Sequence, residues 1–240
     1  MAFYQKMLPI YLWTLLLVFI CSIAASELVR ANSGVPASSG SAELPTIVLD
    51  PGHGGEDGGA VSPNGLRESD LNLEISLRTG DLLRFLGFPV ILTRETDRSI
   101  CDPGAASVSE KKVSDLKNRV RLTEETPNAL LLSIHQNMFP EAKYYGAQVF
   151  YAKTSGSQTL AEELQALCGS RLDVTNRRKA KEAEAIYLLQ HISCPGVLVE
   201  CGFLSNPEEE RKLQTADYQK KLAAVLAAGL TEYLSGTAHS

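Results

Sequence analysis

Between residues 46 and 234, short apolar runs of strand-like composition alternate with helix-length amphipathic segments, and this alternation constrains the fold most strongly. We expect strands at 46–50, 89–93, 129–134, 147–152 and 196–200. We expect helices at 69–86, 114–125, 158–168 and 218–234, the first closing at Gly87 and the second capped by Ser114. This order is typical of a mostly parallel sheet with both faces covered. The sequence therefore predicts a single α/β domain, with a central, mostly parallel mixed sheet flanked by helices on both faces.

The N-terminal segment predicts export. Leu8 to Ala25 is almost wholly apolar, and Lys6 is the only charged residue before it. A membrane span needs roughly 20 apolar residues, so the run fits an N-terminal anchor as well as the core of a cleaved signal peptide. Residues 33–42 are rich in Ser, Gly and Ala, a composition typical of a flexible linker. We predict an extracytoplasmic protein, membrane-anchored or secreted, with three parts: signal peptide or anchor at 1–26, linker at 27–44 and catalytic domain at 45–236.

Charge and cysteine content exclude several classes of protein. The net charge of -5 provides no basic surface, which argues against a nucleic-acid partner. No two cysteines form a CxxC pair, so the chain is neither a zinc ribbon nor a disulfide scaffold. A single disulfide among these cysteines is compatible with the sequence, although we expect most of the cysteines to be small buried side chains. The five cysteines are Cys21, Cys101, Cys168, Cys194 and Cys201.

Three candidate strands lead to a side chain that can bind a metal or move a proton. The first leads to His53, the third to His135 and the last to Glu200. In open α/β sheets, functional sites form beyond the carboxyl ends of the strands. Two neutral imidazoles and one carboxylate, with a fourth position open, form the pattern of a catalytic zinc site, although this ligand set also suits other divalent metals.

The pattern leaves four carboxylates as candidates: Glu56, Asp57, Glu68 and Glu200. Glu68 lies at the start of the first long helix, where the helix dipole favours a negative charge. Glu200 ends an apolar strand, where an ionised carboxylate is costly to bury without a partner. That environment would raise its pKa and suit a general base.

Four motifs together resemble the zinc-dependent N-acetylmuramoyl-L-alanine amidases of the Amidase_3 type. They are DPGHGGEDGGA at 50–60, LRESDLNL at 66–73, LSIHQN at 132–137 and VLVECGFLSN at 197–206. The resemblance runs from about Pro45 to Leu234. It implies one zinc ion held by His53, Glu68 and His135, with Glu200 as the catalytic carboxylate. The implied reaction is hydrolysis of the amide between N-acetylmuramic acid and L-alanine in peptidoglycan.

Residues 144–151, 176–180 and 186–190 are most similar to the CwlD-like spore-cortex and germination branch of this family. This likeness implies removal of stem peptides before muramic-δ-lactam is formed. It also implies a partner protein that activates the enzyme at the membrane or cortex. Family members usually carry small residues where Gln136 and Cys201 stand here. Because neighbours on a strand face opposite sides, we expect Cys201 to point away from Glu200.

Three other interpretations remain at the level of sequence. A zinc-dependent sugar N-deacetylase would use similar chemistry, and a cysteine hydrolase would need Cys201 or Cys194 as its nucleophile. A catalytically silent cell-wall-binding module would keep the fold without the reaction. The basic loop of Arg177, Arg178, Lys179 and Lys181 fits either a substrate contact or a solvated surface.

Overall fold

The computed structural model describes residues 44–237. The predicted signal peptide or anchor lies outside these residues, as does the predicted linker apart from Leu44. Within the described part, no helix combines the length and the apolar character that crossing a bilayer requires. The domain boundaries stay predictions.

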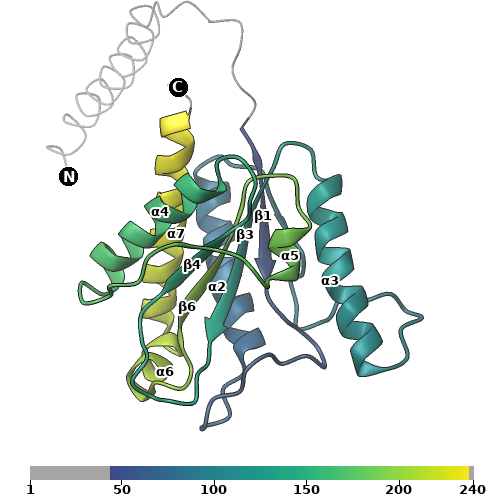
Figure 1. Cartoon of the computed structure of the whole chain (residues 1–240), viewed down its shortest axis with the longest axis horizontal. Helices are drawn as coiled ribbons and strands as arrows, with labels where there is room; N and C mark the ends of the chain where they lie inside the picture. The colour runs from purple at the N-terminus through teal and green to yellow at the C-terminus, as the bar shows by residue number, and fades with distance from the viewer. Residues whose placement is uncertain (1–43, 238–240) are drawn as a thin grey trace, which may run out of the picture. The chain divides into compact units, whose positions relative to one another are not determined.

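Six strands form one mixed sheet in the order β2-β1-β3-β6-β4-β5 (Figure 1). The strands β2, β1, β3 and β6 pair in parallel, β4 runs antiparallel to β6, and β5 is parallel to β4. This confirms the predicted α/β fold with a mostly parallel mixed sheet. The strands are β1 (Thr46–Pro51), β2 (Val90–Leu92), β3 (Ala129–Asn137), β4 (Gln148–Tyr151), β5 (Lys181–Glu182) and β6 (Gly196–Phe203).

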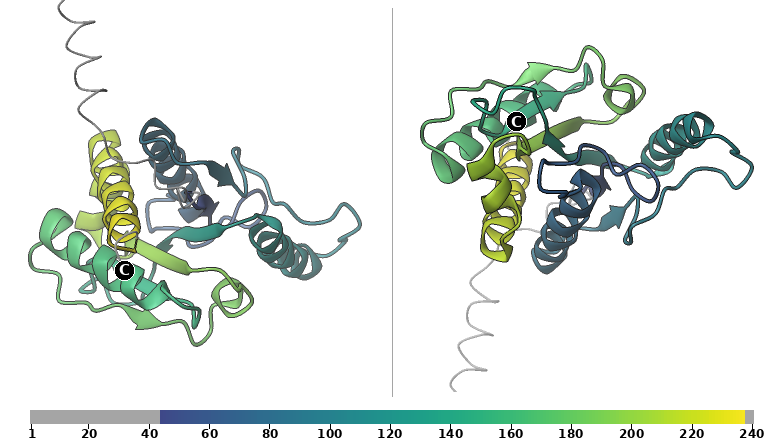
Figure 2. Two further views of the ribbon diagram at one scale, coloured as in Figure 1. Left: turned by 90° about the horizontal axis from the view of Figure 1, so that it is seen from above. Right: turned by 90° about the horizontal axis from the view of Figure 1, so that it is seen from below.

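Helices cover both faces of this sheet. The helices α2, α4 and α7 pack on one face, and α3 and α5 lie on the other (Figure 2). A short π-helical turn, Cys168–Leu172, continues α4. The helices are α2 (Glu68–Phe85), α3 (Val108–Glu125), α4 (Ser157–Leu167), α5 (Tyr187–Gln190), α6 (Pro207–Leu213) and α7 (Ala216–Thr237).

The central strands are buried on both faces, which explains their continuous apolar sequences. Alternate residues point to opposite sides. In β6, Val197 and Val199 belong to the core under α2, α4 and α7, whereas Leu198 belongs to the core under α3 and α5. Cys201 continues the first set and is 1% exposed. It therefore points into that core, as the strand alternation predicts.

The start of α3 corrects one sequence prediction. The helix begins at Val108 and not at Ser114, because Ser107 and Glu110 form a capping box. Ser114 is not the cap: its hydroxyl donates to Asp102 Oδ2 at 2.8 Å. By contrast, α2 closes as predicted, with Gly87 in the left-handed region at φ 90°.

Three strands, β1, β3 and β6, end later than predicted, and the short elements β5, α5 and α6 were not predicted. Because β3 continues to Asn137, His135 lies within this strand and not beyond its end; Glu200 lies within β6 as predicted, and the strand continues to Phe203. The elements β5, α5 and α6 have two, four and seven residues, too few for a periodic pattern. The four described cysteines are all free thiols.

Candidate active site

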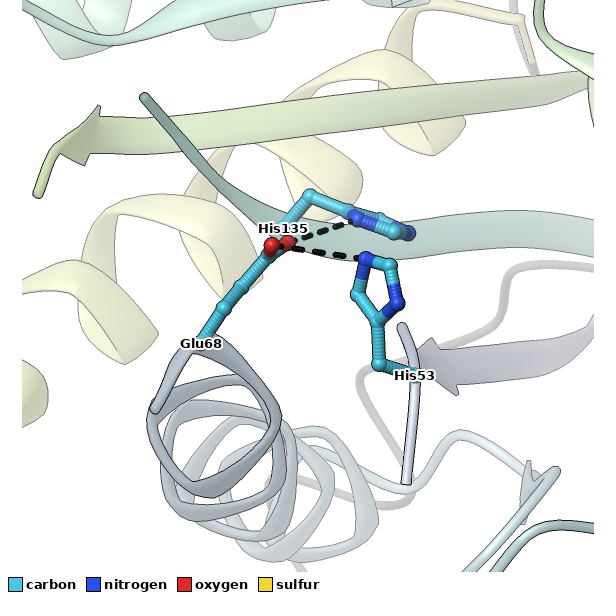
Figure 3. Close-up of side chains that lie close together, drawn as sticks. All are labelled: His53, Glu68 and His135. Carbon is cyan, nitrogen blue, oxygen red and sulfur yellow. Dashed lines mark hydrogen bonds and ion pairs between the residues drawn. The ribbon is translucent and has the colours of Figure 1, made fainter. Parts of the chain in front are cut away.

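His53, Glu68 and His135 come together at the carboxyl edge of the sheet (Figure 3). His53 lies in the loop after β1, Glu68 is the first residue of α2, and His135 lies in β3. One potential ligand atom from each side chain lies within 4.8 Å of the others. Among residues 44–237 no other cluster of this kind was found. Residues far apart in the sequence thus form a compact donor set of two imidazoles and one carboxylate.

Glu68 is the centre of this cluster. Its Oε1 lies 2.9 Å from His135 Nδ1, and its Oε2 lies 3.3 Å from His53 Nε2. The backbone N–H groups of Gln136 and Ala60 donate to the same two oxygens at 3.1 and 2.9 Å. Burial by itself would raise the pKa of Glu68, but its hydrogen bonds to both imidazoles hold that pKa well below the usual range. The carboxylate is therefore ionised and fixed in direction.

The glycine-rich motif leaves room for these side chains. A Cβ on Gly52 would lie 2.1 Å from His135 Nε2, so the imidazole packs directly on bare backbone. A Cβ on Gly59 would lie 2.6 Å from Glu68 Oε2, and Gly59 also has a positive φ of 67°. His53 itself lies in the left-handed region at φ 62°, which is uncommon for a residue with a side chain. The site thus depends on glycine at two positions around a strained histidine.

Asp57 orients His53 from the side opposite to Glu68. Its Oδ2 lies 2.9 Å from His53 Nδ1. Burial lowers the pKa of His53, but the hydrogen bonds with Asp57 and Glu68 outweigh it and raise that pKa to about 9. Glu56, in contrast, is exposed and pairs with Lys111. Of the four candidate carboxylates, Glu68 therefore joins the imidazoles, Asp57 supports one of them and Glu56 faces away.

Glu200 faces the same cavity from β6. It is in register with His135 on the neighbouring strand, and both line a cavity of about 310 Å³ together with His53. Its Oε2 is buried without a hydrogen-bond partner in the described structure. Burial raises the pKa of Glu200 to about 7, with the charge of Glu68 adding to this and the imidazoles opposing it. A half-buried carboxylate with one buried, unpaired oxygen, beside a cluster of side chains able to bind a metal, has the environment of a proton carrier.

Two buried arginines hold the loop that carries His53, and sequence reasoning missed them. Arg119, 2% exposed, donates to the carbonyl oxygens of Pro51 at 2.8 Å and His53 at 2.7 Å. Arg94, 1% exposed, donates to those of Pro51 and Gly52, each at 3.0 Å. The charged side chain of Arg119 in the polar pattern of α3 gives no sequence signal for its burial.

Arg178 and two cysteines were also candidates in the sequence. Arg178 of the basic loop donates to the carbonyl oxygen of Tyr145, and its guanidinium lies 4.5 Å from the ring centroid of Phe203. Burial raises the pKa of Cys201 well above its usual value and that of Cys194 to about 11, opposite to the lowered pKa that activates a cysteine nucleophile. The structure therefore offers no support for the cysteine-hydrolase interpretation.

Comparison with known proteins identifies the family. The family profile described as N-acetylmuramoyl-L-alanine amidase matches residues 47–232. The germination-specific N-acetylmuramoyl-L-alanine amidase of Bacillus subtilis is 42% identical over 190 residues, which cover 79% of each chain. The amidase AmiA of Escherichia coli is 28% identical over 258 residues, covering 88% of this chain and 84% of AmiA.

Solved structures agree with this result. The CwlD amidase of Clostridioides difficile, determined in complex with the GerS lipoprotein, superposes with a TM-score of 0.77 at 40% identity. The alignment covers 80% of this chain and 98% of CwlD. An N-acetylmuramoyl-L-alanine amidase of Clostridium difficile 630 gives a TM-score of 0.70 at 30% identity and covers 80% and 97% of the two chains. The chain therefore belongs to the N-acetylmuramoyl-L-alanine amidase family and is a peptidoglycan amidase.

Proposed function

We propose that this chain hydrolyses the amide between N-acetylmuramic acid and L-alanine with one zinc ion, and that it acts on the spore cortex. His53, Glu68 and His135 would hold the ion, and Glu200 would act as the general base and acid. The observation that carries the proposal is the buried, unpaired Oε2 of Glu200 in the same cavity as His53 and His135, the two imidazoles of the cluster.

The donor set fits zinc on chemical grounds. Two imidazoles and a carboxylate match a catalytic zinc site that keeps a position open for water or substrate. Asp57 at His53 Nδ1 supplies the outer carboxylate that commonly orients a metal-binding histidine. When bound, zinc would polarise the amide carbonyl and lower the pKa of a bound water to about 7.

Glu200 would carry out the two proton transfers. With a pKa near 7, its carboxylate can accept the proton of the attacking water at neutral pH. It can then deliver that proton to the alanine nitrogen, which leaves as an amine. The second transfer matters because an unprotonated amide nitrogen is a poor leaving group. Glu68 is unsuited to this role because both imidazoles keep its pKa low.

Mass spectrometry of digestion products tests the reaction. The full-length chain, supplied with zinc, should release stem peptides that begin with alanine from purified peptidoglycan. A Glu200→Gln variant with the same zinc content should release none. Released acetate without peptide would instead support the sugar N-deacetylase interpretation. Release of neither product from any wall preparation by the zinc-bound chain, with or without the activating partner proposed below, would contradict the proposed reaction.

The proposed spore role rests on the similarity to an amidase that is named as germination-specific and on the CwlD-like resemblance of the sequence. In a spore-forming strain without its own cortex amidase, expression of this chain should restore muramic-δ-lactam to the cortex. The Glu200→Gln variant should not restore it. Restoration of peptide cleavage in the vegetative wall alone would contradict the cortex assignment.

We also propose an activating partner protein and action outside the cytoplasmic membrane. The complex of CwlD with a lipoprotein supports the partner. The predicted N-terminal signal or anchor supports the location. Co-purification of the tagged full-length chain from sporulating cells should recover such a partner. Adding that partner should raise the zinc content or the rate of the purified chain. An unchanged zinc content and rate would contradict activation.

A further inference from the structure

The candidate metal centre lies partway along a longer groove. The cavity that contains His53 and Glu200 has a volume of about 310 Å³. Towards α3 it shares Asp57 and Lys112 with a second hollow of about 440 Å³. Over β4 and β5 it shares Ile186 and Glu200 with a third hollow of about 710 Å³. The groove thus has two arms, which we call the α3 arm and the β5 arm, and a branched substrate cut at the centre would occupy both.

Lys112 contributes an ammonium group where the α3 arm meets the centre. Its Nζ forms a long ion pair with Asp57 Oδ2 at 3.5 Å, but it donates no hydrogen bond in the described part of the chain, and its side chain is 56% exposed. The preceding residue, Lys111, differs: its Nζ lies 2.9 and 3.0 Å from the two carboxylate oxygens of Glu56. Of two adjacent lysines on one helix, Lys111 is committed to a protein partner and Lys112 keeps donors for a ligand.

Asp57 leaves the N–H groups of Lys112 free to donate to a ligand, because both carboxylate oxygens of Asp57 have other hydrogen-bond partners. Asp57 Oδ2 lies 2.9 Å from His53 Nδ1, and Oδ1 accepts from the backbone N–H of Gly59 at 3.2 Å. Lys112 is therefore positioned by Asp57 without a direct hydrogen bond. Asp57 contacts both His53 and Lys112, so only the Asp57 side chain lies between the Lys112 ammonium and the histidine that would bind the metal.

The two arms differ in the charged side chains that remain without an ion-pair partner. In the α3 arm, Asp97 and Asp115 are each paired with an arginine outside the arm, while Arg98 has no ion pair among the described residues. In the β5 arm, Lys181 lies with three carboxylates, of Glu182, Glu184 and Glu200, and only Glu182 is paired, with Lys153. A carboxylate on a ligand is therefore better accommodated in the α3 arm.

We propose that Lys112 binds the free carboxylate of the second stem-peptide residue, so that the α3 arm holds the peptide and the β5 arm holds the glycan. This inference rests on the proposed amidase function. An extended peptide advances about 3.3–3.6 Å per residue, which places a group on the second residue roughly 7 Å beyond the scissile amide. That reach matches an ammonium one side chain away from the histidine that would bind the metal.

Two muramyl dipeptides that differ in one group provide the test. Both have the γ-carboxyl group of the second residue capped as a methylamide; one keeps the free α-carboxylate of D-glutamate, and the other carries the α-amide, D-isoglutamine. The zinc-supplied full-length chain is compared with Lys112→Met and with the matched control Lys111→Met. We expect Lys112→Met to raise KM about five-fold for the glutamate substrate, with kcat unchanged, as for a partly exposed charged contact. Its KM for the isoglutamine substrate and both constants of Lys111→Met should equal those of the wild type.

Binding measurements separate this inference from the proposed reaction. Calorimetry with the zinc-loaded Glu200→Gln chain, with and without Lys112→Met, gives affinities for both dipeptides whether or not they are cleaved. A loss of affinity for the glutamate form alone supports the role of Lys112. Equal losses for both dipeptides, or no loss for either, would overturn it. If the wild type binds but cleaves neither dipeptide, the proposed reaction fails while the affinities still decide on Lys112.

Discussion

At the scale of single residues, the site depends on carboxylates whose neighbours give them different roles. Glu68 is held ionised between two imidazoles, whereas burial raises the pKa of Glu200 to about 7. Asp57 supports His53 from behind. Three chemically similar groups within one site thus differ through their surroundings alone, which suits them to the proposed roles of ligand, proton carrier and orienting partner.

The pH dependence of kcat tests the role of Glu200. A general base works when deprotonated, so activity should fall as the pH drops through the pKa of Glu200. That pKa is about 7 without a cation, and a bound cation would stabilise the carboxylate, so we expect the acidic limb at or below pH 7. Glu200→Gln should lower kcat by about 10²–10⁴-fold and abolish this limb. An unchanged limb in the variant would assign it to another group.

The affinity for zinc tests the role of Asp57. Removing a carboxylate that orients a metal-binding histidine typically weakens metal binding about 10- to 100-fold, and we expect this for Asp57→Asn. Competition with a chelating dye measures the affinity. Glu56→Gln is the matched control, because Glu56 is the preceding residue and pairs with Lys111 on the surface. Equal affinities in the two variants would show that Asp57 does not support the site.

At the scale of elements, the loop after β1 brings the site together. Its carbonyl oxygens are held by Arg94 and Arg119, and its glycines let His135 approach the backbone. The carboxyl ends of β1, β3 and β6 lie at one edge because these strands are parallel. The conformation of this loop therefore brings His53 next to Glu68 and His135 at that edge.

Gly52→Ala should displace His135 and prevent zinc binding. The new Cβ would lie 2.1 Å from Nε2 of the imidazole, so the ring must leave its position. Metal analysis of the purified variant and its residual activity measure the effect, and both should be close to zero. Gly104→Ala is the control, since a Cβ there meets nothing within 4 Å. A zinc-loaded, active Gly52→Ala protein would contradict this account of the glycine.

The buried ion pair between Asp50 of β1 and Arg119 of α3 should shape acid stability. Burial opposes ionisation of Asp50, but Arg119, Ser133 and Thr93 lower its pKa from 3.8 to about 2. The ionised form therefore stabilises the fold above about pH 4, and roughly 2 kcal/mol is lost as the pH falls to about 2.

Chemical denaturation across this pH range measures the contribution. Asp50→Asn should cost about 3–5 kcal/mol at neutral pH, because it leaves a buried guanidinium short of its partner. It should also show less loss of stability between pH 4 and pH 2. Asp81→Asn, at an exposed position on α2, should behave as the wild type. An equal acid sensitivity in Asp50→Asn would assign the loss to other carboxylates.

At the scale of the whole domain, the proposed zinc site joins β1, α2 and β3, so zinc should stabilise the fold. A ligand at 100 times its Kd stabilises by about 2.7 kcal/mol, which raises the Tm of a domain of this size by roughly 5–10 °C. Calorimetry before and after chelation measures the change. A His53→Ala and His135→Ala double variant should show no zinc-dependent shift. A shift retained in this variant would place the zinc elsewhere.

Much of this protein follows from its sequence. The alternating apolar runs determine an α/β sheet, because such runs bury both faces of a strand. The histidines and carboxylates near strand ends predict one site, since parallel strands bring those ends to a common edge. The prediction of helix ends was less accurate: the start of α3 at Val108 was not predicted, although Ser107 and Glu110 form a capping-box sequence.

Only the tertiary structure decided how the carboxylates differ. The sequence pattern left the choice among Glu56, Asp57, Glu68 and Glu200 open, because spacing along a chain does not specify distances across a loop. The resemblance to a family suggested roles for two of them, and the folded geometry separates all four by contact and burial. Arg94 and Arg119 became apparent only in the structure, since an arginine in a polar pattern normally faces solvent and only the packing of distant elements buries it.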